Sequence, residues 1–138
     1  MNDVSVKHPE WLDIDVNGTI SHGYDQEWFD DEWQRLSGCG PTSATQVLSY
    51  SEFRDGLLDV STTANHTLAL DRMNVVWNYV KPRFGGGVYK TQWMERGLRR
   101  LFDDKNLPYE VHMLNVSPFS ASRVEVEAAA QFIHDALS

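Results

Sequence analysis

The only cysteine of the chain, Cys39, is the side chain best suited to nucleophilic chemistry. Gly38 and Gly40 flank it, and Pro41 follows. The two glycines place no side chain beside the sulfur, and a proline is well tolerated in the first turn of a helix. Free N–H groups and the positive dipole end at a helix start favour a thiolate. A lone cysteine is often only a small buried side chain, but this pattern favours a nucleophile.

Four helices are predicted to position this residue and build the core around it. The helix after the cysteine is expected from about Pro41 to Phe53, since apolar or small residues recur there at i, i+3, i+4 and i+7. The predicted inward faces are Ala44, Val47, Leu48 and Ser51 in the first helix; Ala69, Met73, Val76, Trp77 and Val80 in a second, residues 68–80; Met94, Leu98, Leu101 and Phe102 in a third, capped by Thr91; and Ala129, Phe132, Ile133 and Leu137 in a fourth, opened by a Ser122–Glu125 capping box.

Two segments are predicted to form β structure. Residues 14–20 alternate apolar and polar side chains around Asn17-Gly18, which favours a hairpin with a tight turn. The competing interpretation is a calcium loop beginning at Asp13, but its twelfth position is Tyr24, where a bidentate glutamate is needed. Residues 109–116 are β-branched and alternating, which predicts one later strand.

Two further segments have distinctive compositions. Residues 24–38 combine aromatic and acidic side chains, typical of a loop packed on the core or of a groove wall for a cationic or peptide substrate. Packing is the favoured interpretation. Residues 85–87 are three glycines without the lysine of a phosphate loop. They predict a hinge or a close approach of the backbone.

Composition narrows the class of protein. The chain has 138 residues with a formal charge of −8, which suits one globular domain, residues 1–138, and argues against nucleic-acid binding. One cysteine forms no internal disulfide, and neither a signal peptide nor a membrane span is recognisable. We therefore expect a cytoplasmic protein that does not associate with membranes. No cofactor or metal site is predicted.

The run Gly-Cys-Gly-Pro-Thr-Ser-Ala at residues 38–44 resembles the nucleophile motif of papain-like cysteine peptidases. The similarity is to the bacteriocin-processing (double-glycine leader) type and its bacterial relatives. It implies an α+β, papain-like fold, represented mainly by its N-terminal helical half: about four helices, an N-terminal hairpin and one later strand. The order of residues 87–102 and then 109–116 is similar to that family. The chain would then be truncated before the main sheet.

Carried over from this resemblance, Cys39 would be the nucleophile, and its backbone N–H would form an oxyanion hole with an upstream glutamine amide. Gln34 lies five residues before the cysteine, whereas the family places its glutamine about six before, so Gln26 stays as the alternative. The general base of the family is a histidine on a later strand, and among the five histidines His112 fits that context best. The others are His8 and His22, which precede the cysteine, His66, expected in a loop, and His134, on the last helix.

The predicted function is that of a cysteine peptidase or amidase that attacks a peptide or amide carbonyl. The strand of His112 corresponds to the one before the histidine strand of the family, so the general base is not identified in these residues. Two explanations follow: the chain is part of a longer hydrolase, or catalysis has been lost. A partner chain or homo-oligomer would then cover the helical half. The alternative function is a non-catalytic binding or interaction module that retains the peptidase-like fold.

Overall fold

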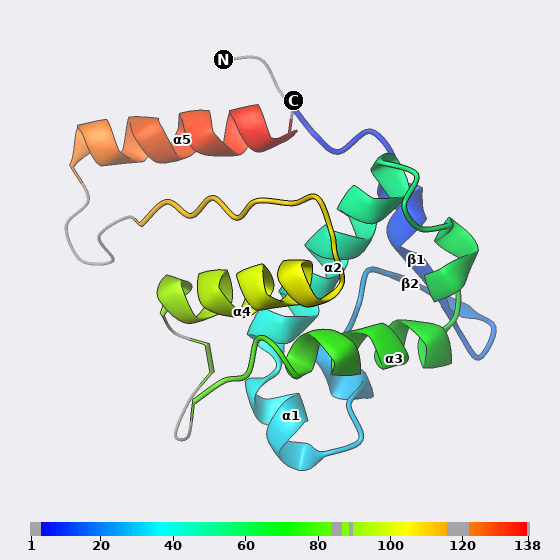
Figure 1. Ribbon diagram of the computed structural model, residues 1–138. Helices are drawn as coiled ribbons and strands as arrows, with labels where there is room; N and C mark the ends of the chain where they lie inside the picture. Colours follow the sequence, from blue (N-terminus) through cyan, green and yellow to red (C-terminus); the bar gives the residue numbers. More distant parts are fainter. Residues whose placement is uncertain (1–3, 84–86, 89, 116–121, 138) are drawn as a thin grey trace. The chain divides into compact units, whose positions relative to one another are not determined.

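The computed structural model describes residues 4–83, 87–88, 90–115 and 122–137. Within these residues it contains five α-helices and a two-stranded antiparallel sheet, which confirms a mixed α+β class (Figure 1). The chain divides into two compact units, residues 10–111 and residues 1–9 with 112–138. The elements are β1 (Asp13–Val16), β2 (Thr19–His22), α1 (Glu32–Ser37), α2 (Cys39–Arg54), α3 (His66–Trp77), α4 (Thr91–Asp104) and α5 (Arg123–Leu137), with short 3-10 helices at Pro9–Leu12, Gln26–Trp28 and Val60–Thr63.

The predicted hairpin is confirmed. Strand β1 pairs with β2 so that Val16 lies opposite Thr19 across the turn. Asn17 and Gly18 both have positive φ, 54° and 90°, the backbone that a two-residue hairpin turn requires. The N–H of Gly18 donates to Asp15 Oδ1 at 2.7 Å, so local chemistry alone favours the turn. Ile14 is fully buried and anchors the hairpin to the core.

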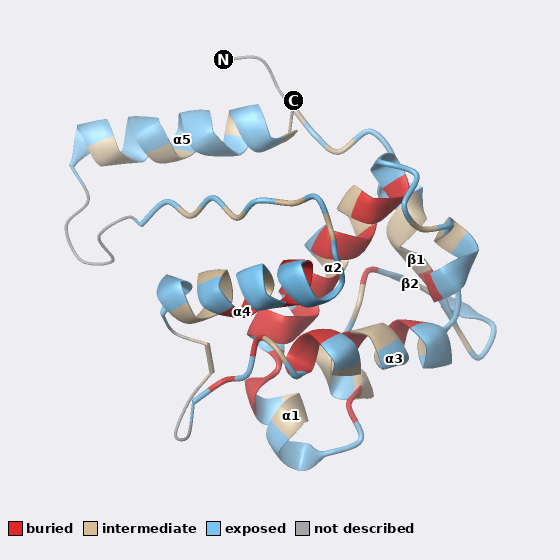
Figure 2. Cartoon of the chain, in the orientation of Figure 1, coloured by how far each residue is buried: buried red, intermediate tan, exposed pale blue. Residues whose placement is uncertain are grey.

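The main core of the first unit lies between α2, α3 and α4 (Figure 2). Its buried members are Ala44 and Leu48 from α2, Val76 and Val80 from α3 and the turn after it, and Leu101 and Phe102 from α4. The whole predicted inward stripe from Ala69 to Val80 is buried, which confirms the helical period. The helix itself starts at His66 rather than residue 68, because the Asn65 side chain caps it, and it ends at Trp77. His66 is therefore a helical residue and lies in no loop.

The buried face of α2 differs from the predicted one. Val47 is 68% exposed, although its spacing placed it inward. The face is rotated toward polar residues, and Thr45, Ser49 and Glu52 are buried instead. Thr45 Oγ1 donates to the Pro41 carbonyl at 2.7 Å, which satisfies its hydroxyl inside the helix. Apolar periodicity could not reveal that Thr45, Ser49 and Glu52, which are polar but hydrogen-bonded, are buried on this helix.

Helix α4 approaches the end of α3 through a glycine. Gly97 is buried, and a Cβ at this position would meet the backbone carbonyl of Tyr79. Met94 and Leu98 pack against the core as half-buried side chains, and Leu101 and Phe102 are buried, as predicted. The N-cap is Lys90 and Thr91 is the first helical residue, so the prediction that Thr91 caps the helix is wrong.

The predicted strand at residues 109–116 does not form over residues 109–115, and Val116 lies outside the described residues. A strand needs a neighbour with which to pair, and the described part of the chain offers this segment none. Instead Tyr109 packs edge-on against Phe102, with ring centroids 5.7 Å apart, and its hydroxyl donates to Asp55 Oδ2 at 3.0 Å. Tyr109 and Val111 thus pack on the core by side-chain contacts.

Tyr109 is expected to make stability fall at alkaline pH. Burial, together with its hydrogen bond to Asp55, raises the pKa of Tyr109 from its ordinary 10.0 to about 12. The folded state therefore keeps the phenol proton after the unfolded state has lost it, so this stability is present below pH 10.0 and is lost as the pH rises toward 12. Urea unfolding should show a steeper alkaline loss for the native chain than for Tyr109→Phe. Parallel pH profiles would contradict the assignment.

In the second unit the predicted capping box of α5 is confirmed. Glu125 N–H donates to Ser122 Oγ at 3.2 Å, and Ser122 N–H donates to Glu125 Oε2 at 2.7 Å. No residue described in α5 is buried, and Val124 is 75% exposed (Figure 2). The apolar side chains predicted to face inward, Phe132 and Ile133, are exposed as well. Amphipathic spacing predicted the helix correctly and the burial of these two side chains wrongly.

Candidate functional site

Cys39 is the first residue of α2, and its thiol is free and exposed. The helix start predicted from Pro41 is therefore confirmed. Gly38 precedes it as N-cap and supplies no side-chain hydrogen bond to the first turn. The positive end of a 16-residue helix thus lies beside the sulfur without a competing capping side chain.

The two glycines beside Cys39 are required by packing. Gly38 is buried, and a Cβ there would clash with the Gln34 carbonyl and lie 2.7 Å from the Phe29 ring. Gly40 is buried on the other side, where a Cβ would lie 2.9 Å from Val88 Cγ2. Cys39 is exposed between two tightly packed backbone positions. The two glycines therefore leave the sulfur uncrowded and also fix the backbone on either side of it.

Gly87 lies next to the sulfur. A Cβ at Gly87 would be 3.7 Å from Cys39 Sγ and 3.9 Å from the Ser37 carbonyl oxygen. The prediction of a close backbone approach at the three glycines is confirmed for Gly87, and Gly85 and Gly86 lie outside the described residues. Because Gly87 has no side chain, this approach leaves the thiol exposed.

A short helix that the sequence reasoning missed leads into the site. Helix α1 lies within residues 24–38, for which the sequence predicts a packed loop or groove wall. Asp31 is its N-cap, and the Asp31 carboxylate accepts from the Gln34 N–H at 3.2 Å. Arg35 Nη1 donates to the carbonyls of Phe29 and Asp30, which ties the loop before the helix to it. An aspartate followed by a glutamate is a helix-start signal that could have identified α1.

The two candidate oxyanion donors have partners of their own. Gln34 Nε2 donates to Asn74 Oδ1 on α3 at 3.3 Å. Gln26 Nε2 donates to the Arg35 carbonyl at 2.6 Å. Gln34 lies on the turn before Cys39, with its carbonyl against Gly38, but its amide is directed to α3. Each Nε2 carries two N–H donors, and the bond to Asn74 or to Arg35 uses one of them.

The histidines are distributed over both units. His112 belongs to the unit formed by residues 1–9 and 112–138, and its segment is not a strand. Within residues 10–111 the histidines are His22 and His66. His22 Nδ1 is bonded to Asp13 Oδ1 at 2.7 Å, and the His66 ring packs edge-on against Trp28 at 5.2 Å. His22 thus lies on the hairpin itself, and His66 lies against the short 3-10 helix that follows the hairpin.

The residues of the alternative calcium loop serve the hairpin. Asp13 binds His22, and Asp15 Oδ1 accepts from Gly18. Over the described residues, no group of three or more histidine, cysteine, aspartate or glutamate side chains has the arrangement needed to hold a metal ion. Nor does that part of the chain contain a helix long and apolar enough to cross a membrane. Comparison with family models, curated proteins and solved structures gave no significant match.

Proposed function

We propose that Cys39 is the nucleophile of a cysteine peptidase- or amidase-like acyl transfer. The observation that carries the proposal is the exposure of a thiol at the start of α2, beside the bare backbone of Gly87. The thiolate would attack a peptide or amide carbonyl and form a carbon–sulfur bond. Collapse of the tetrahedral adduct would break the carbon–nitrogen bond, with a proton passing to the leaving amine. Water would then hydrolyse the thioester.

Backbone groups at the helix start are the first candidates to stabilise the oxyanion. Negative charge is favoured at a helix N-terminus, and Gly38 does not occupy this end with a side chain. In this proposal Gln34 or Gln26 adds a side-chain amide, and a general base removes the thiol proton and returns it to the leaving amine. The motif at residues 38–44 supports this assignment by its resemblance to the papain-like nucleophile motif.

A second candidate function is a non-catalytic binding module. The engaged amides of Gln34 and Gln26 favour it, because the bonds to Asn74 and to the Arg35 carbonyl stabilise the surroundings of Cys39 in a resting arrangement. In that case the fold keeps the cysteine helix without turnover. The two functions differ in one measurable property, the reactivity of the thiol toward an acyl donor.

Acylation of the thiol by p-nitrophenyl acetate tests the proposal. The chain has one cysteine, so a thioester found by mass spectrometry lies on Cys39. A general base contributes about 100-fold or more, so the folded chain should be acylated about 100-fold faster than the same chain in urea. Cys39→Ser should abolish the thioester. Release of p-nitrophenolate beyond one equivalent would show turnover.

Gly87→Leu provides a matched steric variant. Its side chain would extend beside Cys39 Sγ and slow acylation, whereas Gly18→Asn, in the hairpin turn, leaves the space around the sulfur unchanged. Equal acylation rates in the folded and urea-unfolded native chain would refute the enzymatic proposal and support the binding module.

A further inference from the structure

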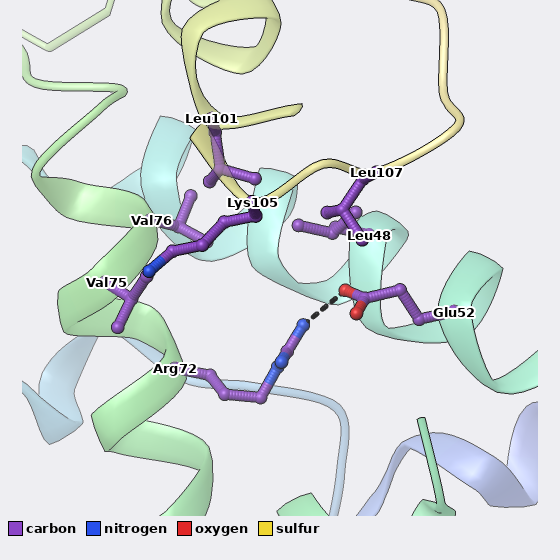
Figure 3. A pocket seen from close by; sticks show the side chains of 8 residues that line it. All are labelled: Leu48, Glu52, Arg72, Val75, Val76, Leu101, Lys105 and Leu107. Carbon is purple, nitrogen blue, oxygen red and sulfur yellow. Dashed lines mark hydrogen bonds and ion pairs between the residues drawn. The ribbon is translucent and has the colours of Figure 1, made fainter. Parts of the chain in front are cut away.

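A cavity of about 170 Å³ opens between α2, α3 and the end of α4 (Figure 3). All of its walls belong to the unit of residues 10–111. Its lining residues are Leu48, Glu52, Arg72, Val75, Val76, Leu101, Lys105 and Leu107. Glu52 follows Cys39 by thirteen residues on α2, which separates the two along the helix by about 20 Å. The cavity is therefore distinct from the proposed nucleophile.

The inner wall of the cavity is apolar. Leu48, Val76 and Leu101 are buried members of the main core, and Leu107 packs against the same cluster. In an apolar cavity of about 150 Å³ a benzene molecule is accommodated. A ring or a short branched chain is thus the largest apolar group that this space holds.

The outer wall is charged. Arg72 extends from α3 toward Glu52 of α2, and its Nη2 lies 2.5 Å from Glu52 Oε1 (Figure 3). Arg72 Nε also donates to Ser49 Oγ at 3.2 Å. The Glu52 side chain is only 8% exposed, so its charge is balanced by Arg72 inside the protein. Arg72 Nη1 takes part in neither of these bonds.

Lys105 adds a second cation to the same wall. Its side chain extends from the end of α4 toward Val75 of α3, across the cavity from Glu52 (Figure 3). No hydrogen bond or ion pair joins the Lys105 ammonium to any other residue that the structure describes. With Glu52 balanced by Arg72, the cavity carries one positive charge in excess, in a chain whose formal charge is −8.

We propose that this cavity binds a small monocarboxylate with an apolar body, of the size of a benzoate or a branched short-chain acid. The apolar body fills the space between Leu48, Val76 and Leu101. The carboxylate stays at the opening, where it accepts from Lys105 and from Arg72 Nη1. A ligand of this kind contacts the apolar wall with its body and pairs the excess positive charge with its carboxylate. A neutral analogue leaves that positive charge unpaired, and an amine adds a second positive charge beside it.

Fluorine NMR with 4-fluorobenzoate tests the proposal on the full chain. We expect saturable broadening of the ligand signal with a dissociation constant of about 1 mM or tighter. 4-Fluorobenzyl alcohol should bind at least tenfold more weakly, and 4-fluorobenzylamine weaker still. Equal binding of the alcohol would overturn the role of the charged wall, and no binding of the acid would overturn the site.

Two substitutions locate the binding. Lys105→Glu should weaken 4-fluorobenzoate at least tenfold, whereas Lys81→Glu makes the same charge change outside the cavity and should leave it within twofold. Val75→Phe, at a half-exposed lining position, should fill the cavity and abolish binding without unfolding the chain, which circular dichroism confirms for each variant. Equal weakening by Lys105→Glu and Lys81→Glu would show nonspecific attraction and refute the site.

Discussion

Replacement of Gly97 by alanine should destabilise the protein, although alanine is the better helix former. A mid-helix glycine costs up to about 1 kcal/mol relative to alanine, so an exposed position would gain stability. At Gly97 the added Cβ would clash with the carbonyl oxygen of Tyr79 and lie 3.2 Å from Val80 Cγ2. Relief requires a shift of backbone, and overpacking costs about 1–3 kcal/mol or more. We expect a net loss of about 2 kcal/mol.

Urea unfolding monitored by circular dichroism measures this loss as a lower midpoint with an unchanged slope. Gln92→Ala is the matched control, because Gln92 is exposed on the same helix and should change stability by less than about 0.5 kcal/mol. An increase in stability for Gly97→Ala would show that α4 does not approach Tyr79 this closely.

Met73→Ala should cause the largest loss of stability. Met73 is fully buried and packs in a cluster with Phe29 and Trp77. Truncating a buried methionine to alanine costs about 2–5 kcal/mol, because apolar contact is lost and a cavity remains. The Phe29 ring also packs against Gly38. The substitution should therefore loosen the backbone before Cys39 and lower the acylation rate as well.

Met73→Leu is the control for this prediction, since it nearly preserves volume and should cost less than about 1.5 kcal/mol. Thermal unfolding and acylation measured on both variants separate loss of packing from loss of the methionine itself. If Met73→Ala were as stable as Met73→Leu, the Phe29–Trp77 cluster would not contribute to the core as the structure indicates.

Local signals in the sequence were sufficient to predict the structure where a few neighbouring residues decide the backbone conformation. Asn17-Gly18 specified the hairpin, Pro41 indicated the start of α2, and Ser122 with Glu125 predicted the cap of α5. Each of these depends on backbone dihedrals or hydrogen bonds within four residues. No distant segment is needed to make them favourable.

The predictions that the structure contradicts depend on contacts between distant parts of the chain. The strand expected at residues 109–116 lacks a neighbouring strand in the described part of the chain, and Tyr109 binds Asp55 instead. On α2, Glu52 is buried because Arg72 of another helix neutralises its charge. The spacing of apolar residues does not reveal such a pair. In α5, amphipathic spacing predicts the helix but not its burial, because burial needs a surface to pack against.

Sequence patterns alone predicted correctly that the cysteine lies at a helix start, and they predicted the helical period of the buried stripe of α3. Only the tertiary structure decided that Gly87 lies beside Cys39, that the amides of Gln34 and Gln26 bond elsewhere, and that three helices enclose a charged cavity. The difference lies in the distance along the chain over which each interaction acts. Dihedral preferences and caps act between neighbours in the chain, whereas close approach and charge pairing join residues that only folding brings together.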